Sequence, residues 1–135
     1  MERMKVMIDG SNFSTLDGFY DEIDRVLTKD LTWKTGHNLN AYNDILRGGF
    51  GVHECGQPLE IHWVNSEKSR QDFGYAATEQ YLQNIYKICH PSNRERISEK
   101  IEACKNHQGQ TLFDEIIEIT LDTDNSGHDC TVIYE

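Results

Sequence analysis

The fold of this chain is indicated most clearly by one stretch of its sequence, Trp33-Lys34-Thr35-Gly36-His37-Asn38-Leu39-Asn40-Ala41-Tyr42-Asn43-Asp44-Ile45-Leu46. Its first part combines an aromatic residue with a glycine, which is typical of a loop. Asn38 is a good N-cap residue, because its side-chain oxygen can accept a hydrogen bond from the first helical turn. Apolar side chains then recur at helical spacing up to Leu46. The stretch therefore predicts a loop followed by a short helix, which ends at Gly48-Gly49.

Strands are predicted on both sides of this helix. Residues 4–8 form a short apolar run, and residues 58–64 alternate apolar with polar side chains. Between the first strand and the loop, apolar residues recur every three or four positions over residues 16–27. This spacing predicts a helix that begins at Ser14, where Asp17 completes an acidic variant of a capping box.

Three more helices and a closing strand are predicted in the second half of the chain. The first helix is expected over residues 75–89. The second is expected to follow a capping box formed by Ser92 and Glu95, and the third to span residues 111–121 after a capping box formed by Thr111 and Asp114. The strand is expected over residues 130–134.

The resulting order of elements is β-α-α-β-α-α-α-β. Helices between all strands favour parallel pairing, because only a crossover connection returns the chain in the same direction. We therefore expect one α/β domain over residues 1–135, with a small three-stranded parallel sheet packed with helices.

The chain is acidic. It has 135 residues, with 13 Lys and Arg against 23 Asp and Glu, and a formal net charge of −10. Residues 106–135 hold seven of the acids and no Lys or Arg. Such a chain repels phosphate backbones and anionic lipids, so we expect no direct binding of nucleic acid and no membrane contact. Either a basic protein partner or the need for solubility can explain the charge.

The sequence predicts a cytoplasmic protein. The first residues contain charges and lack the apolar core of a signal peptide, and no run is long enough for a membrane helix. The four cysteines are then expected as free thiols.

Each cysteine has a histidine nearby, in His53-x-Cys55, Cys89-His90, Cys104-x-x-His107 and His128-x-Cys130. These are residue types that bind zinc or act as nucleophiles, so a metal or thiol site is one hypothesis. No paired CxxC spacing and no known catalytic motif accompanies them. We therefore expect no catalytic residue, no metal and no cofactor.

Three segments resemble the barstar family of ribonuclease inhibitors. They are the start of the chain from Val6 to Gly10, the stretch over residues 33–46, and the strand over residues 58–63 together with residues 114–135. The middle segment resembles the family pattern Gly-x-Asn-Leu-Asp-Ala-x-x-Asp-x-Leu. The resemblance covers about two thirds of the chain. It leaves out residues 70–110, approximately, where we expect a helical insertion.

The resemblance implies a binding protein and not an enzyme: an inhibitor that occludes the active site of a basic ribonuclease, or of a related toxin protein, through an acidic helix face. An immunity role would follow. Asp44 matches the carboxylate that takes the place of the substrate phosphate. Asn40 and Asn43 depart from the Asp and the Trp-type residue found at these positions in the family. The implied partner-binding residues are Trp33, Gly36, Asn38, Leu39, Asn40, Ala41, Asn43, Asp44 and Asp122.

Simpler roles exist for these residues. Asn38 can serve only as a helix cap, Asp44 can be an ordinary solvated side chain, and Trp33 can fold over the core. The alternative function is a barstar-fold interaction module whose partner is not a nuclease and binds the segment over residues 70–110. If the last helix lies beside the second one, the C-terminal acids and Asp44 are expected to form one acidic face.

Overall fold

The computed structural model describes residues 3–28, 36–49, 51–122 and 128–135. Trp33, with most of the predicted loop before the second helix, and the predicted turn at residues 125–127 lie outside the described residues. The strands are β1 (Met4–Asp9), β2 (Leu59–Val64) and β3 (Cys130–Tyr134). The α-helices are α1 (Leu16–Leu27), α2 (Leu39–Arg47), α3 (Ser66–Asp72), α4 (Tyr75–Ile88), α5 (Arg94–Lys105) and α6 (Leu112–Leu121), and two short 3-10 helices are η1 (Gly10–Asn12) and η2 (Pro91–Asn93).

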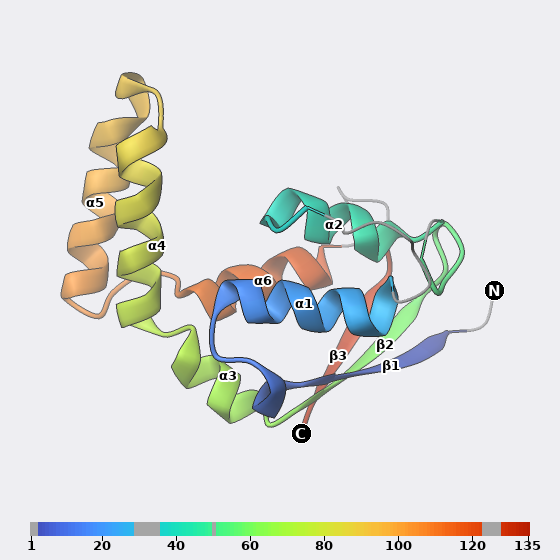
Figure 1. The fold of residues 1–135 in the computed structure, drawn as a ribbon. Helices are drawn as coiled ribbons and strands as arrows, with labels where there is room; N and C mark the ends of the chain where they lie inside the picture. The colour runs from blue at the N-terminus through green and yellow to red at the C-terminus, as the bar shows by residue number, and fades with distance from the viewer. Residues whose placement is uncertain (1–2, 29–35, 50, 123–127) are drawn as a thin grey trace.

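The three strands form one parallel sheet in the order β1-β2-β3. Ile8 pairs with Trp63 in the central strand, and Trp63 pairs with Tyr134. Helices α1, α2 and α6 lie on the same side of this sheet (Figure 1). The predicted α/β fold with a three-stranded parallel sheet is confirmed.

The core between sheet and helices is aromatic. Trp63 is fully buried; its ring stacks on Phe19 of α1 at 5.7 Å and meets Phe113 of α6 edge-on at 5.4 Å. Phe19 also meets Tyr42 of α2 at 5.2 Å. One aromatic cluster therefore holds α1, α2 and α6 on the sheet, through offset and edge contacts that aromatic rings favour.

The other face of the sheet is open to solvent. Met7 of β1 is 57 % exposed and Ile133 of β3 is 39 % exposed, with His62 of β2 between them in register. In the central strand, burial alternates with each residue, so the pattern that predicted the strand also fixes which face is covered.

Two of the predicted helix starts are wrong. Helix α1 is capped by Thr15, whose hydroxyl accepts from the N–H of Gly18, while the Ser14 hydroxyl accepts from Lys68. Ser92 does not cap α5; that helix begins at Arg94 after the 3-10 turn that Pro91 starts. The predicted capping box at Thr111 is confirmed.

The structure also contains one helix that was not predicted, α3, between β2 and α4. After it, α4 and α5 pack together as a helical hairpin that projects away from the sheet (Figure 1). This α4–α5 hairpin has a small apolar cluster of its own, formed by Leu82, Ile97, Ile101 and Cys104.

Candidate functional site

Helix α2 is positioned by its N-cap. The backbone of Asn38 is extended, and its Oδ1 accepts a hydrogen bond of 2.8 Å from the N–H of Ala41. The predicted capping role of Asn38 is thus confirmed. Gly36 lies close to the first turn of α2. A Cβ atom added at Gly36 would lie 3.2 Å from Asn38 Nδ2 and 3.4 Å from the Ala41 Cβ. A side chain at Gly36 would crowd the start of the helix.

The buried side of α2 is fixed to α6. Tyr42, Ile45 and Leu46 are buried, and the Tyr42 hydroxyl lies 2.6 Å from Thr120 Oγ1. Thr120 in turn donates to the carbonyl of Ile116 at 2.8 Å. The side of α2 away from these contacts is exposed, so the helix is held rigidly while one face stays accessible.

Asp44 lies on that exposed side. Its side chain is 61 % exposed, and its Oδ1 lies 3.5 Å from Nη1 of Arg47, one turn further along α2. An exposed pair of this kind contributes little to stability. The Asp44 carboxylate is therefore accessible to a cationic partner, which would have to displace or outcompete Arg47.

The other implied partner-binding residues of α2 differ in exposure. Asn40 is exposed, whereas Leu39, Ala41 and Asn43 are half-buried. The Oδ1 atom of Asn43 is buried and has no hydrogen-bond partner among the described residues. Asp122 is half-buried and is the C-cap residue of α6, the helix that packs against α2.

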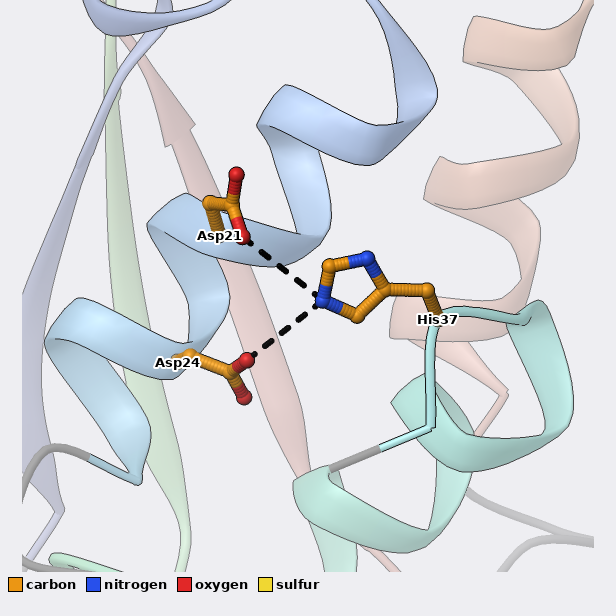
Figure 2. A group of neighbouring side chains, drawn as sticks. All are labelled: Asp21, Asp24 and His37. Atoms are coloured by element: carbon orange, nitrogen blue, oxygen red, sulfur yellow. Dashed lines mark ion pairs between the residues drawn. The ribbon is translucent and has the colours of Figure 1, made fainter. Parts of the chain in front are cut away.

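Three aspartates and one histidine form a cluster that sequence reasoning missed. His37, next to the N-cap of α2, lies over α1: its Nδ1 is 3.5 Å from Asp17, and its Nε2 is 3.6 Å from both Asp21 and Asp24. Figure 2 shows the ring pointing between Asp21 and Asp24. The three aspartates stand at helical spacing in the sequence, which could have revealed their shared face. Nothing in the sequence places His37 beside them.

This cluster extends the acidic surface beyond α2. Asp17 and Asp21 are exposed on α1, and His37 links them to the first turn of α2. Since α1 packs against α2, a partner that reaches the exposed side of α2 near Asn38 also meets these carboxylates. The surface made of α2 and the aspartates of α1 is called the α1–α2 surface below.

Glu22 of α1 is a buried carboxylate with a structural role. It is 4 % exposed and accepts hydrogen bonds from the Asp9 N–H, from Asn12 and from Arg25. Burial would raise its pKa, but the bonds from Arg25, Asp9 and Asn12 together lower it. Glu22 therefore stays ionised, with its charge fully satisfied inside the fold.

On the open face of the sheet, His62 lies between two carboxylates. Its Nδ1 is 2.8 Å from Glu135 and its Nε2 is 2.8 Å from Glu60. Both ring nitrogens donate only in the protonated ring, so Glu135 and then Glu60 raise the pKa of His62.

The histidines of two of the four Cys–His pairs bind the backbone inside the fold. Buried His53 and His128 bind backbone carbonyls, at Leu46 and at Ile119 and Thr120 respectively. Burial raises the pKa of the Cys130 thiol to about 12. Among the described residues, the group of three possible metal ligands consists of Asp21, Asp24 and His37, and no cysteine belongs to it.

Comparison with known proteins identifies the family. A family model described as Barstar (barnase inhibitor) matches residues 3–110. The match includes the stretch over residues 33–46 and the segment over residues 70–110, and it ends before α6. No curated protein and no solved structure matches the chain. None of the described helices has the length and apolar character needed to cross a membrane.

Proposed function

The chain belongs to the barstar family, and from this premise we propose that it inhibits a basic ribonuclease by placing the exposed side of α2 in the enzyme's active-site groove. The observation that carries the proposal is the accessible carboxylate of Asp44 on a helix whose opposite side is fixed in the core.

The chemistry of such a groove explains why a carboxylate suits it. A ribonuclease holds the phosphate of its substrate with cationic and hydrogen-bonding side chains. A carboxylate placed among them receives charge-assisted hydrogen bonds, which are about twice as strong as neutral ones. Because α2 is held by Tyr42 and its aromatic neighbours, little conformational freedom is lost when Asp44 binds.

The aspartates of α1 support the same partner. Asp17, Asp21 and Asp24 add three carboxylates to the α1–α2 surface, near His37 at the start of α2. Complementary charge accelerates association and makes it sensitive to salt. The standard example of this effect is the prototype pair of the barstar family itself, so the general rule adds no independent support.

Two departures from the family pattern shape the choice of partner. Asn40 replaces a carboxylate and Asn43 replaces a Trp-type side chain, so one charged and one large apolar contact are lost. We therefore expect a partner whose groove differs from that of barnase, either another basic ribonuclease or a related toxin. Acting as its inhibitor, the protein would serve as an immunity protein, and cytoplasmic residence would suit this role.

The proposal is tested by binding and inhibition assays with Asp44 variants. Barnase is the first enzyme to use, followed by basic ribonucleases captured from the source cell by the immobilised chain. We expect inhibition that is competitive with RNA and weakens with salt. Asp44→Ala and Asp44→Asn should each cost about 2 kcal/mol or more of binding free energy, as for a central interface residue. Glu99→Gln, an exposed charge change on α5, should bind like the parent.

The same assay separates this function from the alternative one. If Asp44→Ala inhibits as well as the parent, the active-site model is wrong. If binding is instead lost on Ile88→Asp, which changes a side chain that is 85 % exposed at the end of α4, the partner binds the α4–α5 hairpin. That outcome would favour an interaction module whose partner is not recognised through a phosphate-binding groove.

A further inference from the structure

We propose that Asp21, Asp24 and His37 bind one divalent transition-metal cation, for which Zn²⁺ is the best match. One ligand atom from each residue lies within 4.8 Å of the other two, and the Nε2 of His37 is 3.6 Å from each carboxylate (Figure 2). The three residues are called the His37 site below.

The spacing of the ligand atoms fits tetrahedral coordination. Zinc bonds to histidine nitrogen are about 2.0–2.1 Å long and those to carboxylate oxygen about 2.0–2.2 Å, which places the nitrogen and oxygen donors of a tetrahedron about 3.3–3.5 Å apart. The observed nitrogen–oxygen distances of 3.6 Å exceed this value only slightly, and the two carboxylate oxygens lie within 4.8 Å of each other. Metal binding would therefore require the two partly exposed aspartate side chains to rotate toward each other.

The surroundings of His37 match those of a metal-binding histidine. Such a ring usually donates its other N–H to a carboxylate, which fixes its orientation. Here Asp17 lies 3.5 Å from Nδ1, on the far side of the ring from Asp21 and Asp24. The ring also lies against Tyr20, with their centroids 5.3 Å apart. These neighbours hold Nε2 toward the two carboxylates.

Asp24 is oriented in the same way. Its Oδ1 accepts a hydrogen bond of 2.8 Å from the hydroxyl of Thr28, while its Oδ2 is the atom that lies near His37. One carboxylate oxygen is thus held by the protein and the other is presented to the site. Hydrogen-bonded carboxylates of this kind are typical of metal ligands.

The donor set also selects the class of cation. Calcium and magnesium prefer six or more oxygen ligands, which this site does not supply. One imidazole with two carboxylates suits zinc and its neighbours, and three protein ligands leave a fourth position for water. A divalent cation would also offset the repulsion between Asp21 and Asp24. Without a cation, a protonated His37 would take that role, and the experiment must distinguish the two states.

The test uses the tag-free chain, kept reduced, and does not depend on the proposed function because no partner is present. Titration calorimetry with Zn²⁺ should give one site per chain. Co²⁺ should give a visible spectrum of a tetrahedral nitrogen–oxygen site. His37→Gln and Asp21→Asn should each weaken binding at least about tenfold, since even the loss of a residue that only supports a ligand can cost that much. His107→Asn, an exposed histidine in a left-handed backbone conformation that Asn tolerates, should bind like the parent.

Three results would overturn the proposal. They are the absence of stoichiometric Zn²⁺ binding to the folded parent, binding that is unchanged by His37→Gln, and a thiolate-to-cobalt charge-transfer band, which would place the metal on a cysteine. His37 and Asp21 are partly exposed, so their variants are expected to fold, and circular dichroism checks this. A metal-induced rise in melting temperature that is lost in His37→Gln provides a second measurement.

Discussion

We expect Tyr42→Phe and Thr120→Val to destabilise the chain unequally, because the hydrogen bonds that join α2 to α6 have a defined direction. The Thr120 hydroxyl donates its proton to the carbonyl of Ile116 at 2.8 Å. The bond of 2.6 Å between the two side chains must then be donated by Tyr42 and accepted by Thr120. Burial raises the pKa of Tyr42, so its hydroxyl keeps this proton at ordinary pH.

The direction of the bond determines the size of each effect. Tyr42→Phe removes a donor and leaves Thr120 with its bond to Ile116, so it should cost about 1 kcal/mol of the free energy of unfolding, the net value of one hydrogen bond. Thr120→Val removes the acceptor and leaves a buried tyrosine hydroxyl without a partner. Its cost should be about 2 kcal/mol, because the desolvation of that hydroxyl is no longer compensated.

The double variant distinguishes this explanation from a simple loss of packing. With both hydroxyls absent, no buried donor is left without an acceptor, so Tyr42→Phe/Thr120→Val should be more stable than Thr120→Val alone. Urea unfolding of all four proteins at one pH provides the free energies, and unchanged m-values confirm that the comparison is valid. A Tyr42→Phe variant that is less stable than Thr120→Val, or costs that simply add, would refute the assigned direction.

Two further predictions concern other parts of the fold. The pKa of His62 is raised by Glu135 and Glu60, so its contribution to stability is fully present below the ordinary histidine pKa and is lost as pH rises through the raised value. His62→Asn should remove this part of the pH dependence in urea unfolding between pH 5 and pH 9, and an unchanged profile would contradict the assignment. Thr111→Ala removes one half of the capping box with Asp114 and should cost about 1 kcal/mol, measured by urea unfolding.

Helix caps could be predicted where the sequence offers a single good candidate. Asn38 and Thr111 each cap the helix that follows, as expected. Where two candidates stand side by side, tertiary contacts decide between them. Thr15 caps α1 because the Ser14 hydroxyl is engaged by Lys68, a residue 54 positions away. Pro91 starts a 3-10 turn and so delays α5 beyond Ser92.

Helix α3 could not be predicted from hydrophobic periodicity. Its sequence is entirely polar, and its buried residues are the serines Ser66 and Ser69. What holds it in place is tertiary: the indole N–H of Trp63 donates to the Ser69 hydroxyl at 3.0 Å, and Phe73 follows in the core. A helix that is stabilised by such contacts leaves little pattern in its own sequence.

The candidate site was predicted in part. The accessible carboxylate of Asp44 and the N-cap of α2 follow from local sequence, because both depend on positions within one helix. The His37 site does not, because it joins a residue before α2 to the face of α1. The pattern that suggested metal ligands in the sequence was cysteines near histidines, whereas the fold brings together a histidine and aspartates.

The acidic surface has a contributor that the sequence did not indicate. Helices α6 and α2 do adjoin through Tyr42 and Thr120, yet most of the described C-terminal acids are engaged elsewhere. They pair or bond in separate places: Asp114 in a capping box, Glu118 with Gln110, Asp129 with Arg3, and Glu135 with His62. The aspartates of α1, which surround His37 next to the N-cap of α2, add carboxylates that lie far from both Asp44 and the C-terminus in the sequence. Net charge along the sequence therefore indicates the sign of the charge on a partner. Which helix face carries the acidic residues depends on packing. A cation at the His37 site and a basic protein partner would both neutralise the aspartates of α1. Binding of one would therefore influence binding of the other.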